Sequence, residues 1–193
     1  MSVTFGSIPA NDAGWPEGVP VGTLWVQTAD KTVGNTGTQT TLLETGVGTL
    51  TLPSSAVRVG SYVEHRHFAV YSSKSGPVGT LTIEVTLGGV SLGSVACDID
   101  SSMSAMRFRM DIQWTIRAIG TSGTVLLCAK LEAQTSAGGG ADTMDIFTIT
   151  GSPVTINWET NSRVIDVLAT WATPNASNTI TTKIGRIDIR QPV

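Results

Sequence analysis

The sequence predicts an all-β protein, and three observations support that prediction. Apolar and polar residues alternate with a period of two over most of the chain from Leu24 onward, as in strands that bury one face. Short clusters of Gly, Ser, Pro and Asn interrupt this alternation and are typical of turns. No stretch of helical length shows a capped apolar stripe. A chain of this kind folds as an antiparallel sandwich or barrel.

The composition fits one folded domain that assembles with other subunits. The chain has 193 residues, of which 40% are hydrophobic and only 14% charged. A domain of this size buries well over half of its unfolded surface and needs no disulfide or metal. Thr, Ser and Gly supply roughly a third of the residues, while the charged fraction lies below the usual quarter. Low-charge strand surfaces favour an assembling protein, because interface cores are depleted of charge.

The charges argue against a nucleic-acid partner. The 12 basic and 15 acidic residues are scattered, whereas a nucleic-acid binder needs clustered bases to neutralise phosphates. The densest basic stretch holds Arg107, Arg109 and Arg117, and Asp111 lies among them on the same strand face.

Targeting signals and cysteine patterns are sparse. The start, MSVTFGSIPANDAG, lacks the basic and apolar regions of a secretion signal. No run approaches the roughly 18 apolar residues of a membrane span. Cys97 and Cys128 form no CxxC motif, and the sequence leaves open whether they pair. We expect assembly in a reducing cytoplasm, no membrane partner and no cofactor.

Residues 1–23 differ from the rest and predict an extended arm. Prolines and glycines punctuate them, so neither a helix nor a central strand is expected. Two interpretations remain open: the arm is a frayed or edge segment of its own domain, or it docks on a neighbouring subunit. The predicted attachment residues are Phe5, Ile8, Pro9, Trp15 and Pro16. We expect residues 24–193 to form a single sandwich domain.

Residues 106–118, MRFRMDIQWTIRA, are the clearest predicted strand. Every second residue from Met106 to Ala118 is apolar, and the residues between them are Arg, Asp, Gln and Thr. A strand of this length extends about 40 Å. One face should meet a core and the other should meet water or a partner.

Other strands follow the same alternation. They are predicted at 81–87, 125–131, 165–171 and 180–189, separated by turn clusters at 73–79, 88–89, 120–123, 136–142 and 173–178. In the last strand Ile180 and Ile184 share one parity, while Ile187 and Ile189 have the other. Gly185 lies between them and predicts a β-bulge that resets the face.

His65 and His67 are the only histidines, and their i, i+2 spacing places both on one strand face. We expect them at a subunit interface, where a ring of histidines around a three-fold axis is one arrangement. Two imidazoles could begin a Zn²⁺ site, but such a site needs further ligands and Glu64 has the opposite parity. The prediction is therefore an interface and no metal.

Other chemistry has only weak signals. No G-x-S-x-G elbow is present. The carboxylate pairs Asp98/Asp100 and Asp142/Asp145 suit a solvated loop as well as a calcium or glycosidase site. The five tryptophans are expected in the core or at an interface rather than stacked on sugars. We expect no catalytic residues and no enzyme.

Several segments resemble a pattern in virion proteins of tailed bacteriophages. They are GTQTTLLETGVGTLTLP at 37–53, GTLTIEVTLGGVSLGS at 79–94, WTIRAIGTSGTVLLCAKLE at 114–132 and TTKIGRIDI at 181–189. The similarity extends over residues 24–189. EHRH at 64–67 departs from the pattern, which has a plainer basic strand there.

The resemblance implies a jelly-roll domain on a virion, assembled in the host cytoplasm. It further implies a homotrimer that serves as a head decoration or head spike, attached to capsid proteins through the arm. The alternative is a receptor- or carbohydrate-binding domain of a tail fibre, with a host glycan as partner. An enzyme of carbohydrate metabolism is a third, weaker interpretation.

Overall fold

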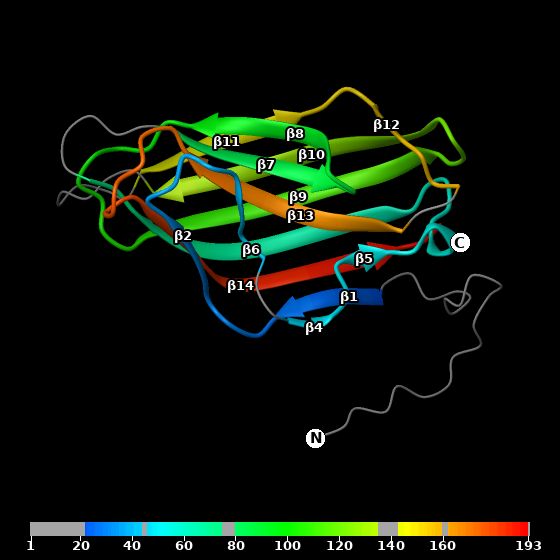
Figure 1. Ribbon diagram of the computed structural model, residues 1–193, viewed down its shortest axis with the longest axis horizontal. Helices are drawn as coiled ribbons and strands as arrows, with labels where there is room; N and C mark the ends of the chain where they lie inside the picture. The colour runs from blue at the N-terminus through cyan, green and yellow to red at the C-terminus, as the bar shows by residue number, and fades with distance from the viewer. Residues whose placement is uncertain (1–21, 44–45, 75–79, 135–142, 160–161, 193) are drawn as a thin grey trace, which may run out of the picture.

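The computed structural model describes residues 22–43, 46–74, 80–134, 143–159 and 162–192. These residues form two antiparallel sheets packed as a sandwich, in which β7, β8 and β13 lie across the strands of the larger sheet (Figure 1). The single helical element in this part of the chain is a 3₁₀ turn, η1, at Ser54–Ala56. The predicted all-β sandwich is confirmed. None of the described helices has the length and hydropathy to cross a membrane.

The larger sheet has nine strands and the smaller has five. The large sheet runs in the order β11-β10-β9-β6-β14-β1-β4, with β12 on β10 and β2 on β14. Its strands are β1 Gly22–Gln27, β2 Lys31–Gly34, β4 Gly46–Gly48, β6 Tyr62–Ser72, β9 Met106–Ala118, β10 Gly123–Gln134, β11 Met144–Thr150, β12 Val154–Ile156 and β14 Thr179–Arg190. The small sheet runs β3-β13-β7-β8, with β5 on β13. Its strands are β3 Thr40–Thr41, β5 Thr51–Leu52, β7 Leu81–Leu87, β8 Val90–Cys97 and β13 Arg163–Trp171.

The strand pairing is that of a jelly roll. The first strands, β1 and β2, pair with the last, β14, and the next, β3 and β5, pair with β13. Inside these pairs β6 pairs with β9, and β7 forms a hairpin with β8. Such nested pairs, divided between two sheets, define the double Greek key of a jelly roll. Strands β10, β11 and β12 are an addition that widens the large sheet beyond β9.

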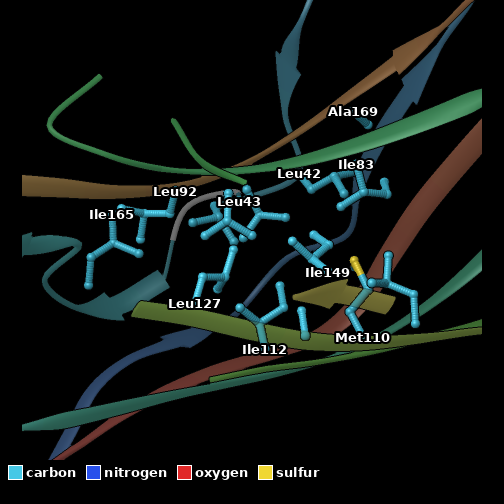
Figure 2. Close-up of a cluster of buried hydrophobic side chains, with 14 of the residues drawn as sticks. Leu42, Leu43, Ile83, Leu92, Met110, Ile112, Leu127, Ile149, Ile165 and Ala169 are labelled. Atoms are coloured by element: carbon cyan, nitrogen blue, oxygen red, sulfur yellow. The ribbon is translucent and has the colours of Figure 1, made fainter. Parts of the chain in front are cut away.

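The core lies between the sheets and is built by alternate residues of each long strand. Along β9 the side chains of Phe108, Met110, Ile112, Trp114 and Ile116 are at most 1% exposed, while the residues between them face outward. Figure 2 shows side chains of both sheets meeting in this interior, among them Ile83 and Ile165 from the small sheet and Met110 and Leu127 from the large one. The buried tryptophans are Trp25, Trp114, Trp158 and Trp171. The predicted alternation and the core positions of these tryptophans are confirmed.

The last strand contains a bulge, but not where the sequence predicted it. The pairing of β14 with β6 shifts between Thr182 and Ile184, before Gly185. Ile184 was expected to share the inward parity of Ile180, and this expectation is wrong because the bulge turns Ile184 outward, where it is 61% exposed. Gly185 has another role. A Cβ there would lie 2.7 Å from Gln27 Oε1 and 2.8 Å from His67 Nδ1, so only glycine lets these side chains pack beside the strand.

Candidate functional site

Charged side chains gather on the outer face of the large sheet. They occupy alternate, outward positions of β6, β9, β10 and β14. The basic members are Arg66, Arg107, Arg109, Arg117, Lys130, Arg186 and Arg190, and the acidic members are Glu64, Asp111, Glu132 and Asp188. A protein whose overall charge is −3 thus has a locally basic face.

The strand register places these charges in cross-strand rows. Arg66 on β6 lies directly opposite Asp111 on β9, and Asp111 lies opposite Lys130 on β10. The adjacent row places Glu64 opposite Gln113, and Gln113 opposite Cys128. Opposite charges thus face one another from β6 to β10, whereas between β14 and β6 like charges are opposite, Arg186 to Arg66 and Asp188 to Glu64. On β6 and β14 the attraction comes instead from the ion pairs within each strand.

Four ion pairs join residues two apart on the same strand. Their separations are 2.6 Å from Arg66 Nη2 to Glu64 Oε1, 2.9 Å from Arg109 Nε to Asp111 Oδ2, 2.5 Å from Lys130 Nζ to Glu132 Oε1, and 2.8 Å from Arg186 Nε to Asp188 Oδ2. The basic side chains are 45–59% exposed and the acidic ones only 10–27%. The acids therefore lie low on the sheet and the cationic groups stand above them.

An open hollow of about 560 Å³ lies over β6, β9, β10 and β11 within this face. We call it the charged hollow. It is lined by Glu64, Arg66, Arg109, Asp111, Gln113, Cys128, Ala129, Lys130, Ile146, Thr148 and Thr150.

The hollow has an apolar residue at each of two opposite sides, Phe68 on β6 and Ile146 on β11. The Arg109 guanidinium lies 5.6 Å from the ring centroid of Phe68, a cation–π contact. Phe68 is 51% exposed and Ile146, at the β11 side, is 58% exposed. The hollow thus offers cationic donors, hydroxyl and amide groups and two apolar surfaces together.

The two cysteines are free and differ in environment. Cys128 is exposed and lines the charged hollow. Cys97 is buried in the core, and burial raises the pKa of its thiol to about 12. Because the thiolate is the reactive form, the raised pKa makes Cys97 unreactive. Cys128 is the accessible thiol and therefore reports on the hollow.

The structure places His65 and His67 inside the sandwich, at 0% and 1% exposure. Neither imidazole reaches the surface of this domain, so the predicted interface role does not fit their position. The Trp114 indole Nε1–H donates to His65 Nε2 over 2.9 Å. Burial lowers the pKa of His67 to about 4 and lowers that of His65 well below its usual 6.5, with neighbouring His67 adding to the latter effect.

The remaining predicted site residues give no second site. Among the described residues, no group of three His, Cys, Asp or Glu side chains is arranged to hold a metal ion. The arm residues lie outside the described part of the chain: Phe5, Ile8, Pro9, Trp15 and Pro16. Asp142 lies outside it as well.

The outer face of the small sheet has a smaller hollow of about 380 Å³ with different chemistry. Its ionisable side chains are Glu84 and Asp166. Gln39 donates to Glu84, and the Thr41 hydroxyl donates to Asp166 over 2.5 Å. Burial raises the pKa of Asp166, although the hydrogen bonds from the Thr41 hydroxyl and the Val167 amide act in the opposite direction.

Sequence reasoning missed the charged hollow, although a signal for it was present. Strands 62–72, 106–118, 123–134 and 179–190 each carry oppositely charged residues two apart, and such pairs share a face. The alignment of these pairs into rows depends on the strand register, which one strand's sequence does not contain.

No family model and no curated protein matches the chain. Among solved structures, the chain is similar to the CBM2 module of the evolved Dit of Lactobacillus casei BL23 phage J-1, with a TM-score of 0.40 and 11% identity over 90% of this chain and 98% of that one. At this TM-score and identity the similarity carries no conclusion about this chain. The class that the strand pairing defines is the jelly-roll β-sandwich.

Proposed function

We propose that the protein is a non-enzymatic binding module of a tailed-phage virion that recognises an acidic carbohydrate polymer in the charged hollow. The observation that carries this proposal is the height difference within the ion pairs: exposed cationic groups stand over less exposed carboxylates. An approaching ligand meets guanidinium and ammonium groups first. The resemblance to phage virion proteins supports the biological setting.

The arginines retain donors for a ligand. Arg66 directs Nε and Nη2 to Glu64 Oε1, at 2.9 and 2.6 Å. A guanidinium has five N–H donors in a fixed fork, so the other Arg66 donors are available to a carboxylate or phosphate on a sugar. Glu64 holds the guanidinium in place, and a held donor loses less entropy when it binds.

The remaining lining suits the neutral parts of a sugar. Gln113, Thr148 and Thr150 supply amide and hydroxyl groups for sugar hydroxyls. Phe68 and Ile146 supply exposed apolar surface for C–H groups. An open hollow of this kind accepts a polymer that continues beyond it on either side.

The head-decoration role, with residues 1–23 as the attachment arm, remains a prediction that no described residue favours over glycan binding. The homotrimer is likewise a prediction.

The test is retention of the intact chain on immobilised polygalacturonate, polyglycerol phosphate and dextran. We expect retention on at least one acidic polymer and none on dextran. Which acidic polymer retains the chain identifies the anionic group as a carboxylate or a phosphate.

Two arginine variants show whether retention is specific. Arg66→Ala should weaken binding by about ten-fold or more, because it removes a charge-assisted donor. Arg117→Ala is the matched control: it removes an exposed arginine from the outward face of β9 outside the hollow. Equal losses in the two variants, or equal retention on dextran, would contradict the proposal.

Protection of Cys128 provides a second readout. A bound polymer should slow the reaction of Cys128 with a thiol reagent, because this thiol lines the hollow. An unchanged rate at saturating polymer would place binding elsewhere.

A further inference from the structure

Beside the charged hollow, the outer face of the large sheet carries an apolar stripe. It consists of Val47 on β4, Val26 on β1, Ile184 on β14 and Phe68 on β6, exposed by 71, 38, 61 and 51%. These four strands are consecutive in the sheet. The stripe therefore crosses the sheet from its β4 edge to the border of the hollow.

The register makes the stripe continuous. Val47 lies directly opposite Val26, and Ile184 lies directly opposite Phe68. Val26 is opposite Arg186, so it is the diagonal neighbour of Ile184, about 7–8 Å away on the same face. Arg186 does not cover this junction, because its guanidinium is directed to Asp188 and to the Thr23 hydroxyl, over 2.8 and 2.9 Å.

The stripe exists because of the bulge in β14. Without the register shift between Thr182 and Ile184, the isoleucine would keep the inward parity of Ile180. A contiguous apolar patch on one face is often a surface that another segment or chain contacts.

We propose that residues 1–21 of the same chain cover this stripe. This segment joins β1 at Gly22, and Val26 lies about 13 Å further along the same strand. Twenty-one residues span up to about 70 Å when extended, so the segment reaches every stripe residue even after reversing direction. The proposal does not rest on the glycan-binding role; where the segment covers Phe68, Ile146 remains as the apolar surface of the hollow.

Composition and tethering favour this occupant. Residues 1–21 contain Phe5, Ile8 and Trp15 as large apolar groups; Asp12 and Glu17 are their only charged side chains. The stripe borders the basic side chains of Arg186, Arg66 and Arg109, so the charges are complementary. A segment tethered at Gly22 has an effective concentration in the millimolar range, which exceeds that of a second copy at micromolar protein.

The test is the rate at which a glutamate-specific protease cleaves the intact chain after Glu17, followed by mass spectrometry. Ile184→Asp places a charge in the middle of the stripe and should raise this rate by about ten-fold, because the covered segment is released. The matched control is Val164→Asp, which changes an apolar residue of similar exposure, 50%, on the outer face of the small sheet. It should leave the rate unchanged.

Two results would overturn the proposal. Equal rates in the two variants would show that the stripe does not hold the segment. Wild-type protection that disappears on dilution from about 100 to about 1 µM would assign the covering segment to a second copy. Should Ile184→Asp fail to fold by circular dichroism, Ile184→Thr keeps the β-branch and should raise the rate in the same direction.

Discussion

The two sheets of the sandwich differ on both of their faces. The outer face of the large sheet carries the four ion pairs and the charged hollow, whereas the outward positions of the small sheet are mostly Thr, Ser and aliphatic, with Glu84 and Asp166 as the carboxylates of its hollow. Seven of the 12 basic residues but only four of the 15 acidic ones lie on this one surface of the large sheet.

The inner faces differ in polarity as well: that of the large sheet is again the more polar of the two. The inward side chains of β7 and β13, from Leu81 to Leu87 and from Ile165 to Trp171, are apolar and at most 1% exposed. The large sheet instead buries a polar group formed by His65, His67, Gln27 and Thr182. In this group both ring nitrogens of His67, His65 Nδ1, Gln27 Oε1 and Thr182 Oγ1 have no hydrogen-bond partner within the described chain.

The contrast indicates that the two sheets contribute differently to stability and to surface charge. An apolar inner face supplies stability through burial alone and is insensitive to pH. A buried polar group makes stability depend on protonation, and an ordered charged surface supplies recognition. The small sheet therefore contributes mainly apolar burial, whereas the large sheet carries the buried histidines and the charged hollow.

The largest effect is expected from the inner face of the small sheet. Trp171→Ala should lower the free energy of unfolding by about 3–5 kcal/mol, because it opens a cavity under a fully buried side chain. The loss should be the same at pH 7 and pH 5, since Cys97, the titratable residue described on this face, has a pKa of about 12 and stays protonated at both pH values. Urea denaturation at both pH values measures it, and a loss that varies with pH would break the contrast between the sheets.

The next effect concerns the buried histidines of the large sheet. Their pKa values are lowered in the folded state, so the unfolded chain binds more protons as the pH falls below 6.5. The stability that neutral His67 provides is fully present above pH 6.5 and is lost down to about pH 4. Each histidine contributes a slope of up to about 1.4 kcal/mol per pH unit in this window.

His67→Leu tests the cause of that slope. The variant removes one of the two titrating groups and should reduce the loss of stability between pH 6.5 and pH 5 by about half. Urea denaturation across this range is the measurement. A profile identical to that of the wild type would show that His67 does not titrate on unfolding as its burial requires.

The smallest effects on stability are expected from two carboxylates, Asp111 on the outer face of the large sheet and Asp166 on that of the small sheet. Asp111→Asn should lower the free energy of unfolding by about 1 kcal/mol or less, because Arg66, Arg109 and Lys130 lose a shared partner. Added salt should reduce this difference by screening the charges.

Asp166→Asn should act in the opposite direction. Because the pKa of Asp166 is raised in the folded state, its contribution to stability is present below the unfolded pKa and is lost as the pH rises through the folded value. At pH 7 an amide removes that cost and still accepts from Thr41 and Val167. Thermal unfolding at low and high salt compares the two variants, and losses of equal size would remove the distinction between the faces.

Much of the fold was predictable from the sequence, because the long strands carry their own signal. The strand predicted at 106–118 coincides with β9, since one face is apolar throughout. The short strands β2 to β5 carry no comparable signal. Each has two to four residues, and they pair because β1, β13 and β14 present edges to them.

The site was less predictable, because it depends on pairing between distant strands. The opposite parity of Ile187 and Ile184 indicated a bulge, but glycine alone did not locate it, since Gly185 is required by the approach of Gln27 and His67. The histidines were misplaced for a related reason: period-two spacing places them on one face but does not say which face is inside.

The most direct test of the central claim, that the large sheet holds the binding site, is to titrate ¹⁵N-labelled intact chain with the acidic oligosaccharide that corresponds to the retained polymer and follow amide chemical shifts. We predict the largest changes on β9 and β10, around Gln113 and Lys130 in the charged hollow, and none around Glu84 and Asp166 on the small sheet. The largest changes around Glu84 and Asp166, or none on either sheet, would contradict the account.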